Sequence, residues 1–126
     1  MKKNFSPNEF RSALSSFATG VTIITTQDLN KEPIGMTASS FNSVSMDPPL
    51  VLWSIAKSAL SAPSFTDATF FAVHVLASDQ AEISNKFAIK GEDKFSNINW
   101  VEDTNCVPII KDVSSRFDCK TYAIHE

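Results

Sequence analysis

Hydroxyl-bearing side chains gather in residues 35–45, and they are the groups in this chain best suited to holding a ligand. The stretch reads G-M-T-A-S-S-F-N-S-V-S, an unusual composition for a strand that only packs. Residues 50–55 follow as the nearly apolar run L-V-L-W-S-I, which ends just before Lys57 and Ser58. Hydroxyls and backbone amides beside a strand that ends in a cation suit an anionic, hydrogen-bonding ligand. A plain hairpin with outward-facing polar residues is the alternative.

Prolines between the two stretches predict a turn. Residues 46–49, M-D-P-P, cannot continue a central strand, because proline lacks the amide donor and fixes φ. Two strands are therefore expected at 35–45 and 50–55, the second of them buried on both faces or lying against a ligand. Upstream, the β-branched residues 21–26 predict the first strand, and the polar residues 27–33 predict a turn.

A capping box predicts a helix near the N-terminus. Residues 6–9, S-P-N-E, place a serine cap, a proline in the first turn and a reciprocal glutamate. Phe10, Leu14 and Phe17 then recur at helical spacing, and Gly20 is a natural stop. We expect this helix to pack its apolar face against the sheet.

Two shorter helices are predicted further along the chain. Ser61 can cap the first, with Phe65 pointing inward. Residues 79–82, D-Q-A-E, resemble a second capping box, after which Ile83 and Phe87 form an apolar stripe. The helix starting near Lys57 and Ser58 would favour a phosphate, whereas the alternative makes those two residues ordinary loop residues.

The second half of the chain predicts further short strands. Residues 70–76 and the alternating residues 114–125 have strand patterns, and the proline in 107–110 argues for an edge strand. Residues 100–105 look irregular. His74 is expected to be a half-buried strand histidine whose hydrogen bonds a neighbour satisfies. Short strands with irregularly placed helices favour an antiparallel sheet or barrel over a Rossmann fold.

Composition excludes several classes of function. A chain of 126 residues with 43% hydrophobic residues predicts a single domain with a core of its own. The net charge of −3 without a basic stripe argues against nucleic acid as a partner. Only three glycines are present, which excludes both a G-x-G-x-x-G fingerprint and a Walker loop.

The remaining titratable residues favour a cytoplasmic protein without a metal. His74 and His125 are far apart and lack ligand-like neighbours, so no metal site is expected. Cys106 and Cys119 have no C-x-x-C spacing and are expected to be reduced thiols in the cytoplasm. No long apolar segment follows the basic N-terminus, so neither a signal peptide nor a membrane span is predicted.

An ordered set of short motifs resembles the short-chain flavin reductase family, whose domain is an FMN-binding split barrel. The motifs are F-R-x-A-L at 10–14, F-A-T-G-V-T at 17–22, T-A-S-S-F-N-S-V-S at 37–45, D-P-P-L-V-L-W-S-I at 47–55, F-A-V-x-V-L at 71–76, S-x-x-F-A at 84–88 and D-K-F at 93–95. The resemblance implies a mainly β fold, an antiparallel Greek-key split β-barrel with an N-terminal helix and short peripheral helices. It also implies a homodimer with flavin near the subunit interface.

The same resemblance implies a flavin site and no catalytic side chain. The residues expected to bind the cofactor are Met36, Thr37, Ala38, Ser39, Ser40, Trp53, Ser54, Ile55, Lys57, Ser58, Lys86, Phe87 and Ala88. The first five would serve the flavin ring and ribityl chain, and Ser54, Ile55 and Ser58, with the charge of Lys57, the ribityl-phosphate side. Phe87 and Ala88, with Lys86 nearby, would close the pocket. Lys94 and Phe95 would either fold back over the ligand or form a mobile loop.

The activity implied is hydride transfer from NADH or NADPH to FMN, or alternatively FAD. The chain would act as an NAD(P)H-dependent flavin reductase, with a two-component monooxygenase as the implied partner. A non-catalytic flavin carrier and a barrel scaffold that has lost flavin binding are the alternatives.

One departure from the family bears on these expectations. Relatives continue past the position of His125 with a Gly-Asp-His segment, so residues 1–126 are expected to be a C-terminally incomplete or naturally short domain. An open sheet edge would then favour tight dimerisation or marginal stability. Relatives also often have asparagine at the position of His74, which puts the role of that residue in doubt.

Overall fold

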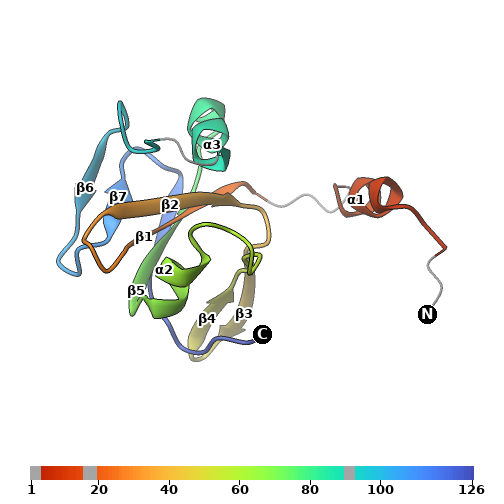
Figure 1. The fold of residues 1–126 in the computed structure, drawn as a ribbon, viewed down its shortest axis with the longest axis horizontal. Coiled ribbons are helices and arrows are strands. Elements are labelled where there is room, and N and C mark those ends of the chain that lie inside the picture. The colour runs from red at the N-terminus through yellow and green to blue at the C-terminus, as the bar shows by residue number, and fades with distance from the viewer. Residues whose placement is uncertain (1–3, 16–19, 90–92) are drawn as a thin grey trace.

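The structure is a computed structural model that describes residues 4–15, 20–89 and 93–126. Its elements, in chain order (Figure 1), are α1 Pro7–Ser15, β1 Thr22–Gln27, β2 Pro33–Ala38, β3 Asn42–Met46, β4 Pro49–Leu52, α2 Ala62–Asp67, β5 Phe70–Val75, α3 Ala81–Ala88, β6 Trp100–Glu102, β7 Pro108–Ile110 and β8 Ser115–Lys120.

The central layer is a four-stranded antiparallel sheet in the order β2-β1-β5-β8. β1 lies inside this sheet, and its β-branched residues are buried on both faces. Ile23 faces a cluster that contains Phe87 and Ile110. Ile24 faces the opposite cluster, which contains Phe65. The core therefore consists of two apolar layers separated by one sheet.

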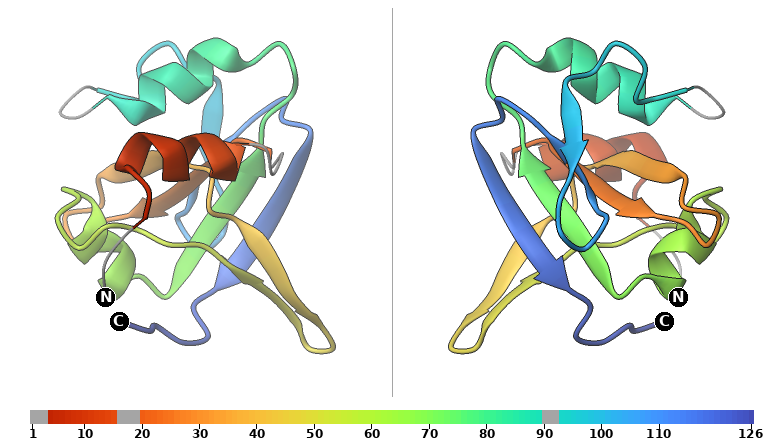
Figure 2. Two further views of the ribbon diagram at one scale, coloured as in Figure 1. Left: turned by 90° about the vertical axis from the view of Figure 1, so that its right-hand side faces the viewer. Right: turned by 90° about the vertical axis from the view of Figure 1, so that its left-hand side faces the viewer.

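Two small hairpins flank this sheet, and their strands differ from the predicted ones. The expected strand over residues 35–45 is two strands, β2 and β3, because the chain leaves the sheet after Ala38. β3 pairs with β4, and this hairpin projects from the body of the molecule (Figure 2). The prediction of a doubly buried strand over 50–55 is wrong: β4 ends at Leu52, and half of the Leu52 side chain is exposed.

The second hairpin joins β6 and β7. Residues 100–105 were expected to be irregular, yet Trp100–Glu102 forms β6. β7 has only one strand partner, as its proline predicts, but all three of its residues are buried. The Thr25 hydroxyl donates to the Pro108 carbonyl at 2.6 Å, which holds β7 against β1.

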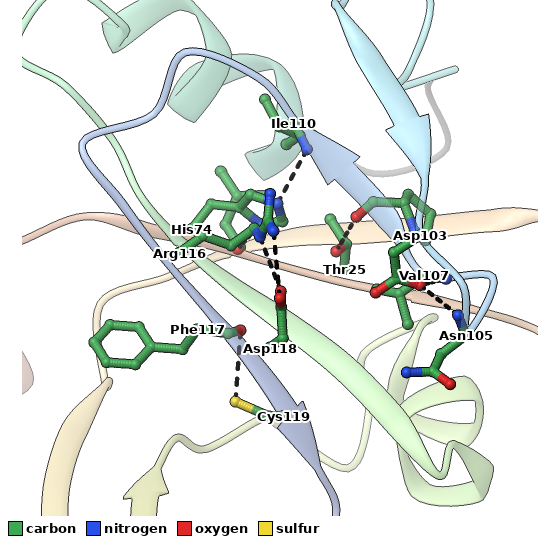
Figure 3. Close-up of polar contacts among 12 residues, drawn as sticks. Thr25, His74, Asp103, Asn105, Val107, Ile110, Arg116, Phe117, Asp118 and Cys119 are labelled. Carbon is green, nitrogen blue, oxygen red and sulfur yellow. Dashed lines mark hydrogen bonds and ion pairs between the residues drawn. The ribbon is translucent and has the colours of Figure 1, made fainter.

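His74 joins three strands from the middle of β5 (Figure 3). Its side chain is completely buried, not half-buried as predicted. Nε2 accepts a hydrogen bond from the Ile110 N–H at 3.0 Å, so Nδ1 carries the proton and donates to the Ile23 carbonyl at 3.0 Å. The expectation that neighbours satisfy this histidine is confirmed. Desolvation by burial lowers the pKa of His74 below its ordinary value.

The N-terminal helix α1 has the predicted cap but not the predicted packing. The Glu9 N–H donates to the Ser6 hydroxyl at 3.1 Å, and the Ser6 N–H donates to the Glu9 carboxylate at 3.0 Å. However, α1 lies apart from the sheets (Figure 1), and Phe10 and Leu14 are more than half exposed. The expectation that α1 covers the sheet of its own chain is therefore wrong. Phe17, a further residue of the predicted stripe, lies outside the described residues.

The other two helices begin as predicted, but their caps differ. Ser61 precedes α2 without capping it, because its hydroxyl points to the Met36 sulfur at 3.7 Å. Gln80, not Asp79, occupies the cap position of α3, so the second capping box is wrong. The Gln80 amide instead accepts from the Ala77 N–H at 2.6 Å and donates to the Asp112 carbonyl at 3.1 Å. Phe65 and Phe87 point inward as predicted.

The predicted fold class, mainly antiparallel β with an N-terminal helix and short peripheral helices, is confirmed. β8 is shorter than the expected strand over residues 114–125 and forms one edge of the main sheet, while β2 forms the other. Within the described residues, no helix has the length and apolar character needed to cross a membrane.

Candidate functional site

The free edge of β2 presents backbone hydrogen-bonding groups to the surroundings. The Asp28 N–H donates to the Glu32 carbonyl at 3.0 Å, which fixes the alternation of hydrogen bonds in the β1–β2 ladder. By this alternation Ile34, Met36 and Ala38 bond to β1, whereas the N–H and C=O groups of Gly35 and Thr37 point away from it. No strand of the described residues pairs with this side of β2. Gly35 is buried and its carbonyl accepts from the Lys94 ammonium, which leaves the outward groups of the partly buried Thr37 for a ligand.

One end of this edge is bound to the chain that follows β4. The Ser54 N–H donates to the Ser40 hydroxyl at 2.9 Å, and this hydroxyl lies 3.2 Å from the Ser54 carbonyl, to which it donates. Both residues are exposed. The structure therefore brings together two of the predicted segments, 36–40 and 53–58.

Apolar side chains pack on the core side of this junction. Trp53 packs edge-on against Phe65, with ring centroids 4.9 Å apart. Met36 and Ile55 join the same cluster, so their side chains face the core. Of the predicted residues, Met36, Ala38, Trp53 and Ile55 thus shape the site mainly through packing and through their backbones.

Lys57 and Ser58 lie beyond this junction in an exposed loop. The Lys57 ammonium is 3.8 Å from the Glu126 carboxylate, and both side chains are at least 80% exposed. Such a pair contributes little stability, so the Lys57 side chain can be redirected toward an anion at small cost. The helix that follows, α2, has only six residues.

The face of β2 opposite this junction packs against α3 (Figure 2). A Cβ atom on Gly35 would lie 2.5 Å from the Phe87 ring, so this close approach requires glycine. Next along β2, the Thr37 hydroxyl donates to the Ser84 carbonyl at 2.7 Å. Phe87 is almost completely buried, so its ring belongs to the core, while Ala88 is exposed. Lys86 bonds to the backbone and hydroxyl oxygens of Ser96.

Lys94 also contacts this edge, although it was not among the residues expected to bind the cofactor. Its ammonium donates to the Gly35 carbonyl at 3.2 Å. Desolvation by burial lowers the pKa of Lys94 below its ordinary value. The motif D-K-F at 93–95 was the available sequence signal, but nothing in it predicts which strand the lysine reaches.

Two hollows on the described part of the chain lie away from the predicted residues. One hollow lies between the β1–β2 turn and α2, bordered by Asp28 and Asp67, and another lies on α1 beside Phe10. Neither is bordered by a residue of the expected cofactor site. Among the described residues there is also no group of three His, Cys, Asp or Glu side chains that could hold a metal ion.

Fold and site together define an antiparallel β domain in which the edge strand β2 lies between α3 and the Ser40–Ser54 junction. The chain belongs to the flavin reductase like domain family, whose signature matches residues 14–126. The predicted family is therefore confirmed.

Individual relatives agree with this assignment. The chain is 47% identical to the FMN reductase (NADH) SmoA of Agrobacterium fabrum over 117 residues, which are 93% of this chain and 66% of the relative. It is 45% identical to the reductase component of the flavin-dependent trigonelline monooxygenase of Acinetobacter baylyi, over 92% of this chain and 37% of the relative. The chain thus spans less than two thirds of the length of these curated relatives.

A solved structure has the same fold. The Streptomyces globisporus NADH:FAD oxidoreductase SgcE6, in complex with NAD and FAD fragments, superposes with a TM-score of 0.84 at 32% identity. The match covers 99% of this chain and 77% of SgcE6.

Proposed function

We propose that this chain binds a flavin along the free edge of β2 and reduces it with NADH or NADPH. The observation that carries the proposal is the arrangement of that edge. The outward N–H and C=O groups of Thr37 lie between the Ser40–Ser54 junction and α3, beside the buried Gly35, whose carbonyl accepts from Lys94. A planar ring with hydrogen-bonding groups along one side is the class of ligand that such an edge accommodates. FMN is the first choice, and FAD is the alternative.

The proposed roles follow from where each group lies. Residues 36–40 offer amides and hydroxyls to the flavin ring and ribityl chain. Ser54, Ile55 and Ser58 hold the ribityl-phosphate side, and the weakly paired Lys57 supplies positive charge. Lys86 and Ala88 border the site from α3. A bound flavin supplies a ring that accepts a hydride, so the protein needs to bind and orient it but needs no general acid or base.

The proposal includes partners and a location. The reduced flavin would serve a monooxygenase of a two-component system, the role that the name of the Acinetobacter baylyi relative describes. A second copy of the chain would cover the exposed side chains of Phe10 and Leu14 and enclose the open site. The free thiols Cys106 and Cys119 are consistent with a reducing cytoplasm.

The experiment is oxidation of NADH and NADPH by the purified chain, with and without FMN, alongside FMN binding measured by fluorescence. Ser40→Asp places a negative charge at the junction and should weaken FMN binding by about tenfold or more. Ser78→Asp, at an exposed loop position away from the site, is the matched control and should bind FMN normally. Light scattering on the same samples tests the dimer.

Each outcome favours one of the three candidate functions: flavin reductase, flavin carrier or scaffold. Flavin-dependent turnover that Ser40→Asp impairs supports the proposal. Flavin binding without nicotinamide oxidation would contradict the reductase activity and favour a flavin carrier. A folded chain without flavin affinity would contradict the proposal entirely and favour a scaffold.

A further inference from the structure

Lys94 is a half-buried cation whose side chain lies at the free edge of β2. Its Nζ atom donates to the Gly35 carbonyl at 3.2 Å, on the side of the strand that points away from β1. No carboxylate of the described residues lies within 4.0 Å of this ammonium, as is also true of most described lysines. A lysine ammonium has three N–H groups, and the Gly35 carbonyl accepts one of them, while Lys94 is only partly buried.

Partial burial disfavours the charge of this ammonium. Burial penalises the charged form of Lys94, as the lowered pKa indicates, and a neutral carbonyl compensates for this only in part. A lysine that only protected the strand edge from pairing would serve equally well with its charge in water. The position of Lys94 is therefore better explained by an anion that completes its environment.

The packing around Lys94 holds it in place. The next residue, Phe95, is buried, and its ring centroid lies 5.1 Å from that of Phe87. The Phe95 ring also lies 3.2 Å from the position that a Cβ atom on Gly35 would occupy. The backbone at Lys94 is thus fixed against the same glycine whose carbonyl its side chain contacts, which is the preorganisation expected of a binding group.

We propose that Lys94 is the cation that stabilises the negative charge which the flavin ring gains on two-electron reduction. This inference rests on the proposed binding of flavin along β2 and adds to it a residue that tunes the ring. The two-electron reduced ring carries a negative charge at neutral pH, and a nearby fixed cation favours that form over the neutral oxidised one. Lys57, beyond the Ser40–Ser54 junction, is the separate cation for the phosphate.

The test is the affinity of each redox state of FMN for Lys94→Met, Lys94→Arg and the exposed control Lys111→Met. For Lys94→Met, we expect reduced FMN to bind about tenfold more weakly and oxidised FMN to bind within about twofold of wild type. A tenfold change in the ratio of the two affinities lowers the midpoint potential of bound FMN by about 30 mV for a two-electron couple, which spectroelectrochemistry measures independently. Lys94→Arg keeps the charge and should restore most of the potential, and Lys111→Met should match wild type.

The same measurements with riboflavin, which lacks the phosphate, separate the two anionic parts of FMN. An equal effect of Lys94→Met on reduced FMN and reduced riboflavin supports the proposal, whereas an effect on FMN only would assign Lys94 to the phosphate and overturn it. Equal weakening of both redox states would overturn it in favour of a packing role. If wild type binds flavin and Lys94→Met leaves the potential unchanged, the inference fails while the proposed function stands. If folded wild type binds no flavin, both fail.

Discussion

Among the described residues, His74 has the only side chain that hydrogen-bonds to both β1 and β7. Replacing it should therefore destabilise the fold. In His74→Leu the Ile23 carbonyl and the Ile110 N–H lose their partners inside the core. Each buried unsatisfied backbone group costs about 1–3 kcal/mol, so the free energy of unfolding should fall by about 2–6 kcal/mol at pH 8. That is a large part of the 5–15 kcal/mol typical of a domain.

The burial of His74 also predicts that the free energy of unfolding depends on pH, and the sign follows from the lowered pKa of His74. The unfolded chain binds a proton at His74 near the ordinary pKa of about 6.5, while the folded protein stays neutral there to lower pH because of burial. Between these two values the unfolded state binds more protons, so stability falls with decreasing pH by about 1.4 kcal/mol per pH unit. Among the charged groups near the ring, Arg116 adds to this effect and Asp118 opposes it.

The assay is urea denaturation of wild type, His74→Leu and His74→Asn from pH 8 to pH 5. His74→Asn keeps an amide that can donate and accept, so it should be less destabilised at pH 8 than His74→Leu. Both variants should lose the part of the acid dependence that His74 contributes. His125→Leu, at an exposed position near the C-terminus, is the control and should behave like wild type. If His74→Asn kept the full wild-type slope, the protonation argument would be wrong.

Two further predictions concern packing and thiol chemistry. Gly35→Ala should lower the free energy of unfolding by about 1–3 kcal/mol in urea denaturation, because its Cβ would lie 2.5 Å from the Phe87 ring. Gly20→Ala is the control and should be nearly neutral, since its Cβ would meet only Val75 at 3.8 Å. Equal effects of the two substitutions would contradict this packing argument. Burial raises the pKa of the Cys119 thiol to about 11. At pH 8 a thiol reagent should therefore label the exposed Cys106 quickly and Cys119 slowly. When labelling is followed by absorbance, Cys106→Ser should remove the fast phase. Fast labelling that persists in Cys106→Ser would refute this.

Sequence patterns predicted those features that depend on neighbours along the chain. The box formed by Ser6 and Glu9 was predictable because both partners lie within one helical turn. The β-branched residues likewise indicated the strand β1, although its burial on both faces is seen only in the folded chain. The apolar stripe of α1 was also visible, but a stripe does not say which surface covers it, and the sheet of the same chain does not.

Features that depend on distant segments were not predictable in the same way. Residues 35–45 contain no proline or glycine after Gly35, so nothing local marks the point where β2 ends and β3 begins. At the cap position of α3, the Gln80 amide bonds to the Asp112 carbonyl, 32 residues away. Lys94 reaches Gly35 across 59 residues, so only the folded chain reveals that contact.

The position of β2 relates its structural role to the flavin site proposed for it. One side of its backbone is bonded to β1 and is unavailable, whereas a strand edge left open is an aggregation hazard that a protein must cover. Here α3 covers one face through Gly35 and Thr37, and the Ser40–Ser54 junction closes one end. The outward carbonyl of Gly35 accepts from the ammonium of Lys94, and the outward backbone groups of Thr37 have no strand partner among the described residues. The packing that protects this edge from another strand is thus also the packing that surrounds the proposed flavin site.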